Sequence, residues 1–283
     1  MLRAVAIIPA RFASTRLPGK PLASLKGKVL IQRVYEQASS AKLIDAVFVA
    51  TDDKRIFDVV NNFGGKAVMT SSSHISGTDR IAEAAKNIDC EIIVNVQGDE
   101  PFIRPEMVDD TVKLLIDDPR AAISTLAKKT TNIEEILSPD VVKVVMDNEG
   151  FAMYFSRSPI PYYRDEWQVQ NTEHRTQSTE NPPSPPFSKG GMEGFVFKLR
   201  TPNSELPTFF CFKHIGIYGF RKEVLIDFSI LEQGRLEMIE KLEQLRALAS
   251  GMKIKVKETV YDTFGIDTIE DLRKAEEWLS LSS

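Results

Sequence analysis

Three cations lie close together after the first apolar run of the chain. The run at 4–8 leads into a segment that carries Arg11, Arg16 and Lys20, with small residues between them. Cations and backbone N–H groups just past the carboxyl end of a buried strand suit a polyanion such as a triphosphate. An ordinary basic surface loop is the alternative, because three cations in ten residues also occur by chance.

This segment differs from the loop of P-loop enzymes. The motif GxxxxGK[ST] needs a glycine where this chain has Ser14 and a hydroxyl residue where it has Pro21, so a metal that accompanies a triphosphate would be held elsewhere. A candidate ligand is Asp99 in VNVQGDEP, at the end of a second apolar run, since Mg²⁺ prefers one or two carboxylates together with phosphate oxygens. The alternative is that Asp99 caps a helix before Pro105. Glu100 is interpreted as part of a turn.

The elements that would position these side chains alternate along the first half of the chain. Apolar runs at 4–8, 46–50, 66–69 and 92–96 predict buried strands, and helical periodicity predicts helices at 31–38, 56–63, 81–88 and 108–115. This alternation is typical of a mostly parallel sheet covered on both faces. The expected fold class is therefore α/β, a Rossmann-like sheet flanked by helices, with a smaller α+β lobe. Because such strands end at one edge of the sheet, the cationic segment and Asp99 should lie together.

The second half of the chain has a different pattern. We expect a hairpin from 141–146 and 151–156 around the turn DNEG, then a strand at 214–220, one helix over 236–248, a strand at 253–260 and a helix at 269–279. Residues 168–207 hold six of the fifteen prolines, which predicts a mobile excursion without regular elements. A partner-binding polyproline segment is the alternative.

The composition excludes several classes of function. With 36 Lys and Arg against 40 Asp and Glu, the net charge is −4. The chain therefore lacks the overall positive charge that is typical of a nucleic-acid-binding protein. The two cysteines form no CxxC pair, which argues against a structural zinc site or a disulfide framework and suits a reducing compartment. No stretch approaches about 20 uninterrupted apolar residues, so we expect no membrane span and a cytoplasmic location.

Two segments, IIPARFASTRLPGKPL and VNVQGDEPFI, resemble the sugar-nucleotidyltransferases. Five more narrow the resemblance to the cytidylyltransferases that activate 3-deoxy-manno-octulosonate (Kdo), and with the first two they cover nearly the whole chain: SSHISGTDRIAE, VVKVVMDNEGFAMYFSRSPIP, HIGIYGF, EKLEQLRAL and GIDT. The resemblance implies a nucleotide-diphospho-sugar transferase fold. It also implies an enzyme that uses Mg²⁺ as cofactor and makes CMP-Kdo from CTP and Kdo for lipopolysaccharide biosynthesis. It also implies a homodimer. The implied division is a nucleotide-binding portion at 1–130, a smaller sugar-binding and dimerisation lobe at 131–222 and a helix–strand–helix at 223–283 that completes the main domain.

The resemblance implies roles for individual residues as well. The catalytic set would be Arg11, Lys20, Asp99 and Asp267, and the Mg²⁺ ligands would be Asp99 and Asp267. The contacts to CTP would come from Ala10, Arg11, Arg16, Lys20, Ser76, Gly77 and Arg80. The contacts to the sugar acid would come from Gln97, Arg157, His214, Tyr218, Glu240, Glu243 and Gln244.

Several of these residues have plainer interpretations. Arg157 would equally suit an ordinary salt bridge, and a lone histidine such as His214 is more often structural than a ligand. Glu240, Glu243 and Gln244 would share one face of the predicted helix, and such a face usually meets solvent. The interval from 161 to 214 is longer than in the family that the chain resembles, which leaves the dimer geometry open.

The expected reaction is in-line attack by the anomeric hydroxyl of the sugar on the α-phosphorus of CTP. The cations would stabilise the departing pyrophosphate. Coordination to the metal would take the place of a general base, since the sequence indicates none. One alternative is CTP-dependent activation of another acidic sugar, such as a sialic acid. The other is a non-catalytic nucleotide-binding homologue.

Overall fold

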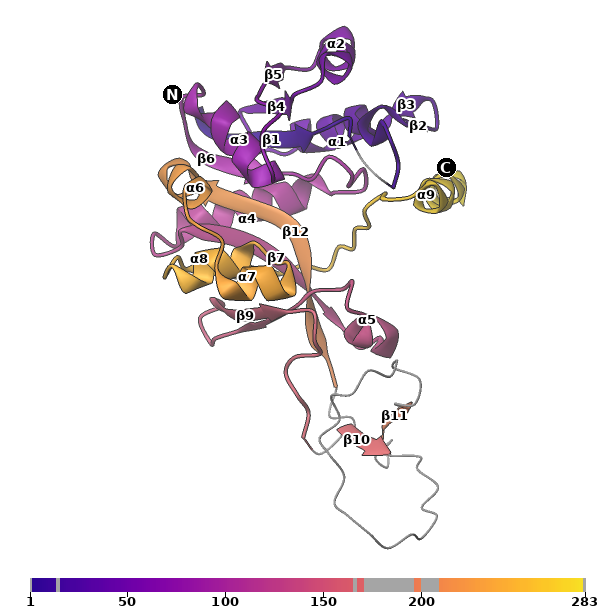
Figure 1. Ribbon diagram of the computed structural model, residues 1–283, viewed down its shortest axis with the longest axis vertical. Coiled ribbons are helices and arrows are strands. Elements are labelled where there is room, and N and C mark those ends of the chain that lie inside the picture. The colour runs from indigo at the N-terminus through magenta and orange to yellow at the C-terminus, as the bar shows by residue number, and fades with distance from the viewer. Residues whose placement is uncertain (1, 14–15, 165–166, 171–195, 200–208, 282–283) are drawn as a thin grey trace, which may run out of the picture.

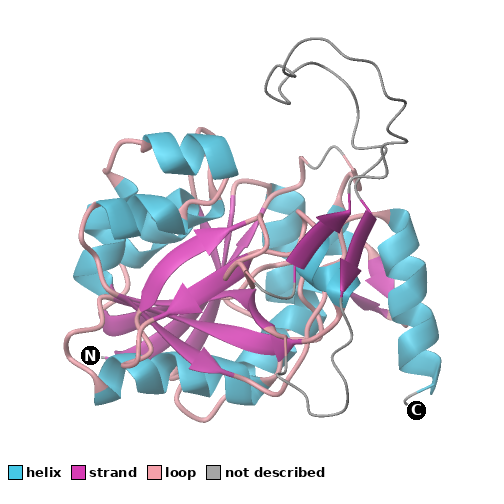
Figure 2. Ribbon diagram, turned by 90° about the horizontal axis from the view of Figure 1, so that it is seen from below, coloured by secondary structure: helices cyan, strands magenta, loops and turns pink. Residues whose placement is uncertain are grey.

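The computed structural model describes residues 2–13, 16–164, 167–170, 196–199 and 209–281. Its main feature is a sheet in the order β13-β7-β12-β6-β1-β4-β5, to which β8 and β9 are joined through β12. Figures 1 and 2 show this sheet as a middle layer with helices on both faces. The strands are β1 (Leu2–Ala10), β4 (Ala46–Thr51), β5 (Ala67–Met69), β6 (Cys90–Asn95), β7 (Ile123–Thr130), β8 (Lys143–Met146), β9 (Ala152–Ser156), β12 (Cys211–Arg221) and β13 (Ile254–Glu258).

The helices and two small sheets complete the described fold. The helices are α1 (Leu30–Ser39), α2 (Lys54–Asn62), α3 (Gly77–Lys86), α4 (Pro105–Asp117), α5 (Ile133–Leu137), α6 (Lys222–Ser229), α7 (Arg235–Glu240), α8 (Gln244–Ala249) and α9 (Ile269–Leu281), with a 3₁₀ turn η1 at Lys20–Leu22. The small sheets pair β2 (Ser24–Leu25) with β3 (Lys28–Val29) and β10 (Trp167–Gln170) with β11 (Val196–Leu199). No helix among the described residues has both the length and the hydrophobicity needed to cross a bilayer.

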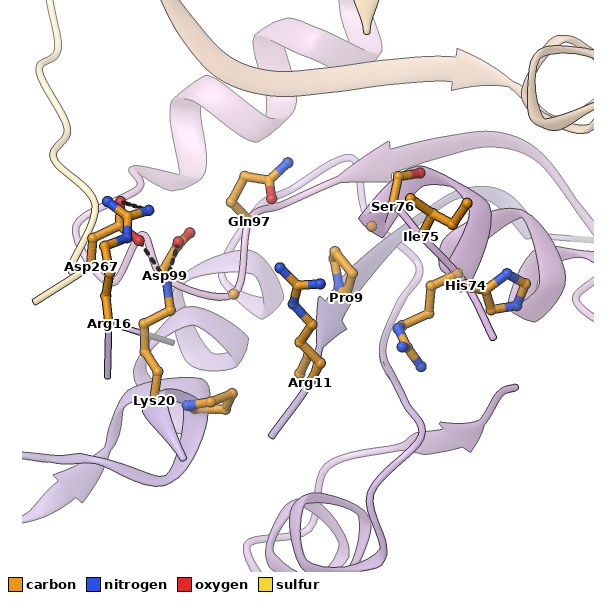
Figure 3. Close-up of a pocket in the computed structure, with 15 residues that line it drawn as sticks. Pro9, Arg11, Arg16, Lys20, His74, Ile75, Ser76, Gln97, Asp99 and Asp267 are labelled. Atoms are coloured by element: carbon orange, nitrogen blue, oxygen red, sulfur yellow. Dashed lines mark hydrogen bonds and ion pairs between the residues drawn. The ribbon is translucent and has the colours of Figure 1, made fainter. Parts of the chain in front are cut away.

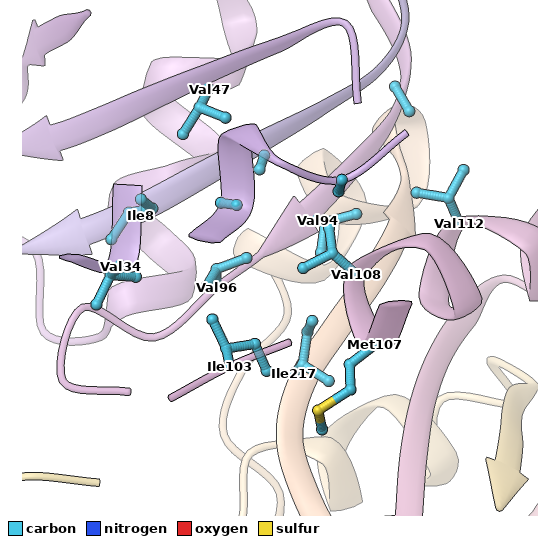
Figure 4. Close-up of a cluster of buried hydrophobic side chains, with 14 of the residues drawn as sticks. Ile8, Val34, Val47, Val94, Val96, Ile103, Met107, Val108, Val112 and Ile217 are labelled. Atoms are coloured by element: carbon cyan, nitrogen blue, oxygen red, sulfur yellow. The ribbon is translucent and has the colours of Figure 1, made fainter. Parts of the chain in front are cut away.

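The predicted α/β class is confirmed, because β1 pairs in parallel with β4 and β6, and β13 pairs in parallel with β7. The central strands are apolar throughout because successive side chains enter different clusters on the two faces. Ile8 and Val94 pack with Val34 of α1 and Val108 of α4 (Figure 4). Ile7, in contrast, packs in a cluster with residues of α3 and α6. Burial of each such side chain contributes about 1.5–3 kcal/mol, so the sheet edge is held by a rigid core.

The long strand β12 runs antiparallel to its neighbours β6, β7 and β8. It therefore joins the predicted hairpin, which the structure confirms as β8 and β9, to the main sheet. The predicted elements did not include β7 or α6. In β7 the lysines at 128 and 129 shorten the apolar run, so its pattern resembles a loop.

The prediction of a single helix over 236–248 is wrong. Helix α7 ends at Glu240, Lys241 adopts a left-handed conformation with φ of 55°, and α8 begins at Gln244. Leu242 in the break and Leu245 in α8 are both buried in the core. Glu240 and Glu243 therefore do not share one helical face.

The Pro-rich stretch at 168–207 is described only in part. The strands β10 and β11 pair in antiparallel register, with Gln170 opposite Val196, so the prediction of no regular element is wrong at these positions. The remaining residues of the predicted excursion, 171–195 and 200–207, lie outside the described residues.

Candidate active site

A cavity of about 440 Å³ lies at the carboxyl ends of β1 and β6. It brings together every residue predicted to contact CTP or Mg²⁺, from segments that are far apart in the sequence (Figure 3). The lining residues are Pro9, Ala10, Arg11, Arg16, Lys20, Pro21, His74, Ile75, Ser76, Gly77, Arg80, Gln97, Gly98, Asp99 and Asp267. The expectation that the strand ends place the cationic segment beside Asp99 is therefore confirmed.

Lys20 joins the two carboxylates that were predicted to bind metal. Its Nζ lies 2.6 Å from Asp99 Oδ2 and 2.9 Å from Asp267 Oδ1, and Arg16 Nη2 lies 3.0 Å from Asp267 Oδ2. Burial of Lys20 alone would lower its pKa, but its ion pairs and hydrogen bonds with Asp99 and Asp267 outweigh this and raise the pKa above its ordinary value of 10.5. The ammonium therefore stays charged at any physiological pH.

These carboxylates fit a hard divalent cation. They converge on one position, which already holds a positive charge from Lys20. Within the described ranges no group of three or more His, Cys, Asp or Glu side chains could hold a metal. Mg²⁺ needs no such group, because it is often held by one or two carboxylates and completes its shell with water and substrate phosphates.

Two glycines shape the loops around these charges. Gly19 has a φ of 69°, and its N–H donates to Phe12 O at 3.1 Å, which closes the cationic loop. The Phe12 ring lies against Gly19, and the Arg55 guanidinium sits 3.3 Å from the ring centroid. A Cβ at Gly98 would lie only 2.8 Å from the backbone oxygen of Pro9, so the QGDEP turn can approach β1 only with glycine at this position.

The start of α3 forms another wall of the cavity. Ser76 caps the helix by accepting a hydrogen bond from Asp79 N at 3.1 Å. The Arg80 guanidinium is buried and donates to Asp52 Oδ2 at 3.0 Å and to Thr70 Oγ1 at 2.7 Å. This arrangement fixes backbone N–H groups and a positive charge beside the cavity, which suits a nucleotide.

His74 also lines this cavity, and its imidazole contacts the Glu83 carboxylate. No role was predicted for His74, because a single histidine in a polar loop has no characteristic spacing to other residues. Its position within the segment SSHISGTDRIAE was the available clue.

The residues predicted for the sugar pocket are spread over several places. Gln97 lines the main cavity. Tyr218, Glu243 and Gln244 line a second space of about 10 Å³, which has barely room for one water molecule. The Thr78 hydroxyl, on the first turn of α3, donates to the Glu243 carboxylate. This contact links the second space to the wall of the main cavity.

Arg157 and Glu240 hold each other in place. The Glu240 carboxylate accepts from Ser156 Oγ at 2.7 Å and from Arg157 N at 3.0 Å. The Arg157 guanidinium donates to the backbone oxygens of Glu240 and Pro139, at 2.7 and 2.8 Å. The predicted role of Arg157 in binding the sugar acid stays a prediction. In this conformation the guanidinium donates its hydrogen bonds to backbone oxygens.

Glu100 lies in a turn, as expected, because its N–H donates to Gln97 O at 3.2 Å and its carbonyl oxygen accepts from Ile103 N at 3.2 Å. Glu100 is not among the residues that line the cavity. Its Oε2 accepts a hydrogen bond from Thr263 Oγ1 at 3.0 Å, and its Oε1 lies 3.4 Å from the position of a Cβ on Gly216. Burial, together with the charge of Asp99, raises the pKa of Glu100 to about 7 against the opposing hydrogen bond from Thr263. No local pattern indicates this contact, because Thr263 lies 163 residues away.

His214 is a buried, neutral imidazole. Its Nε2 lies 2.9 Å from Thr125 Oγ1, and its ring packs against Phe155 and Tyr218. Burial lowers the pKa of His214 from 6.5 to about 3. Between these pH values the unfolded chain binds a proton that the folded chain does not, so this residue destabilises the fold as the pH falls.

Replacement of His214 by phenylalanine should therefore reduce the sensitivity of the fold to acid. The free energy of unfolding of the wild type should fall more steeply between pH 6 and 4 than that of His214→Phe, by about 1.4 kcal/mol per pH unit. Urea unfolding of both proteins at several pH values measures the two slopes. Parallel slopes would contradict the neutral state of the buried imidazole.

Comparison with known proteins identifies the family. Residues 5–254 match the family described as Cytidylyltransferase. The 3-deoxy-manno-octulosonate cytidylyltransferase of Thermodesulfovibrio yellowstonii is 47% identical over 287 aligned residues, which cover 99% of each chain. That of Trichlorobacter lovleyi is 45% identical over 276 residues, with 98% of each chain covered.

Solved structures agree with this assignment. The structure of CMP:2-keto-3-deoxy-manno-octonic acid synthetase complexed with CTP has a TM-score of 0.81 and 37% identity, and covers 99% of this chain and 100% of its own. The 4-diphosphocytidyl-2C-methyl-D-erythritol synthase of Anaerococcus prevotii has a TM-score of 0.57 at 15% identity, covers 98% of this chain and 96% of its own, and shows only a common fold. The chain belongs to the cytidylyltransferase family.

Proposed function

We propose that this chain transfers CMP from CTP to Kdo and releases pyrophosphate, with Mg²⁺ as the cofactor. The observation that carries the proposal is the convergence of Asp99 and Asp267 on Lys20, at the wall of a cavity with further cations. Full-length relatives at 45–47% identity bear the name 3-deoxy-manno-octulosonate cytidylyltransferase, which supports Kdo as the acceptor. We also propose a function in lipopolysaccharide biosynthesis and assembly as a homodimer, which the same relationship supports.

The cations of the cavity have a clear task in this reaction. CTP and Kdo are both anions, so the protein must first offset their repulsion. Arg11, Arg16 and Lys20 present three positive groups to the triphosphate, and they stabilise the charge that grows on the departing pyrophosphate. The buried Arg80, fixed by Asp52, holds the nucleoside end beside the first turn of α3.

Asp99 and Asp267 would hold the Mg²⁺. When bound, the metal supplies Lewis-acid polarisation of a phosphate oxygen and lowers the pKa of the attacking hydroxyl. Because the two carboxylates come from opposite ends of the chain, their positions depend on how the C-terminal segment docks. Gln97 reaches into the same cavity and is placed to orient the sugar by hydrogen bonds to its hydroxyls.

Pyrophosphate release on mixing the protein with CTP, Mg²⁺ and Kdo tests this proposal. We expect stoichiometric CMP-Kdo and pyrophosphate, and neither product when any one component is omitted. Parallel reactions with N-acetylneuraminate in place of Kdo test the alternative of another acidic sugar. Release with N-acetylneuraminate but not with Kdo would contradict the proposed acceptor, and no release with either would support a non-catalytic homologue.

A further inference from the structure

The segment that carries Asp267 crosses the molecule as an extended strap, residues 259–268, between β13 and α9 (Figure 1). It contains no helix or strand, so its path is set by contacts to other elements. Polar contacts fix it along its length: Thr259 N to Ala127 O at 2.9 Å, Asp262 to Lys128 at 2.9 Å and to Lys213 at 2.8 Å, Thr263 Oγ1 to Glu100 at 3.0 Å, and Ile266 N to Asp99 O at 2.9 Å.

The last of these contacts links the backbone of Asp99 to that of Ile266, the residue just before Asp267. Ile266 N donates to the carbonyl oxygen of Asp99, and the Ile266 side chain is fully buried. An aspartate has a short side chain with only two rotatable bonds, so the place of its carboxylate is set mainly by its backbone. What holds the backbone of Asp267 therefore decides where its carboxylate lies relative to Asp99.

Asp271, one turn into α9, holds that backbone directly. A single carboxylate oxygen of Asp271 accepts from Asp267 N at 3.1 Å, from Thr268 N at 2.9 Å and from Thr268 Oγ1 at 2.8 Å. In return, Asp271 N donates to Thr268 Oγ1 at 3.1 Å. This reciprocal pair is a capping box, and it includes the N–H of the metal-ligand residue itself.

Helix α9 is docked independently of the capping contacts. Ile266 and Ala275 form a small buried cluster with Leu25 and Leu30, and partly buried Leu17 from the cationic loop packs against it. The Phe102 ring stacks on Phe264 at 4.6 Å and meets the edge of Trp278 at 4.7 Å. The helix can therefore stay docked when one cap is removed.

We propose that Asp271 is a positioning residue, which fixes the turn at 267–268 so that the Asp267 carboxylate converges with that of Asp99. This inference rests on the proposed function, because it assigns Asp267 to the metal. Without the cap the turn gains freedom, and Asp267 spends less time where both carboxylates can share one cation. The cluster around Ile266 and Ala275 keeps the helix in place, so the loss is one of alignment and not of folding.

The test measures Mn²⁺ binding to the protein–CTP complex by electron paramagnetic resonance of the free ion. Asp271→Ala removes the acceptor and should weaken Mn²⁺ binding by about tenfold, the size of a typical helix-cap contribution. Asp271→Asn keeps one oxygen that can accept the same hydrogen bonds, so it should recover most of the affinity. Glu270→Ala is the matched control, since this neighbouring carboxylate is exposed and pairs with Arg273 of its own helix.

A fluorescence measurement separates positioning from docking. In a Trp167→Phe background, Trp278 is the remaining tryptophan and reports the contact of α9 with Phe102. We expect the Trp278 emission of Asp271→Ala to match that of the parent and the Tm to fall by only a few degrees, as the loss of one helix cap predicts. Undocking of α9 would overturn the proposal, because the effect would then be structural.

The remaining outcomes are also decisive. Unchanged Mn²⁺ affinity in Asp271→Ala, with normal binding by the parent, would overturn the positioning function and leave the proposed reaction intact. Absence of Mn²⁺ binding by the parent itself would contradict the metal site, and with it this inference.

Discussion

Asp99→Asn is expected to lower kcat by about a thousandfold while the protein still binds CTP. The substitution keeps the shape of the side chain and removes its charge, so the site loses one of the two carboxylates that would hold the proposed Mg²⁺. Arg11, Arg16 and Lys20 still bind the triphosphate, and Lys20 keeps its contact with Asp267. Single-turnover kinetics and calorimetric titration with CTP measure the two effects separately.

The matched control is Asp58→Asn. Asp58 also pairs with a lysine, Lys54, at 2.8 Å, but on the surface of α2. Surface ion pairs of this kind contribute little to stability, about 0.5 kcal/mol, and this one does not line the cavity. The control should therefore turn over normally. Near-normal turnover of Asp99→Asn as well would remove this carboxylate from the reaction.

Lys20→Met should reduce kcat/KM for CTP by about a hundredfold to a thousandfold, the usual effect of losing one donor that stabilises transition-state charge. Its long apolar side chain replaces the lysine stem without the ammonium. The fold should survive, because Arg16 still pairs with Asp267.

Lys54→Met serves as the control for this variant, since it removes an ammonium from an ion pair outside the cavity. Its kcat/KM should match that of the wild type. An equal loss in Lys20→Met and Lys54→Met would mean that net charge, and not the position of Lys20, governs CTP binding.

Much of the fold follows from local patterns. The runs at 4–8 and 92–96 are apolar on both faces because β1 and β6 lie inside the sheet, and the chain ends these strands with the cationic loop and with QGDEP. General rules for parallel sheets then place Lys20 and Asp99 at one edge. Local patterns and these rules therefore predict that Lys20 and Asp99 lie close together.

Other features depend on contacts that no short segment encodes. The left-handed conformation of Lys241 ends α7, although Leu242 and Leu245 keep the i, i+3 spacing of a continuous helix, so the helical pattern in the sequence does not show the break. The function of Lys20 as a bridge between two aspartates requires Asp267, 247 residues away, and only the family resemblance suggested it. The contact of the Glu100 side chain with Thr263 has no local pattern either, since 163 residues separate the two.

The predicted sugar pocket shows where the resemblance alone is insufficient. The resemblance implied that Gln97 contacts the sugar, and Gln97 does line the cavity. It did not foresee that Arg157 and Glu240 would be occupied with each other and with backbone oxygens.

Anomalous diffraction from Mn²⁺ in crystals with CTP and a non-reacting Kdo analogue tests the central claim most directly. The account predicts one metal peak that is held by the carboxylates of both Asp99 and Asp267. Lys20 should then have moved from between the carboxylates to the phosphates. A metal held by neither aspartate, or by only one of them with the other turned away, would contradict the account.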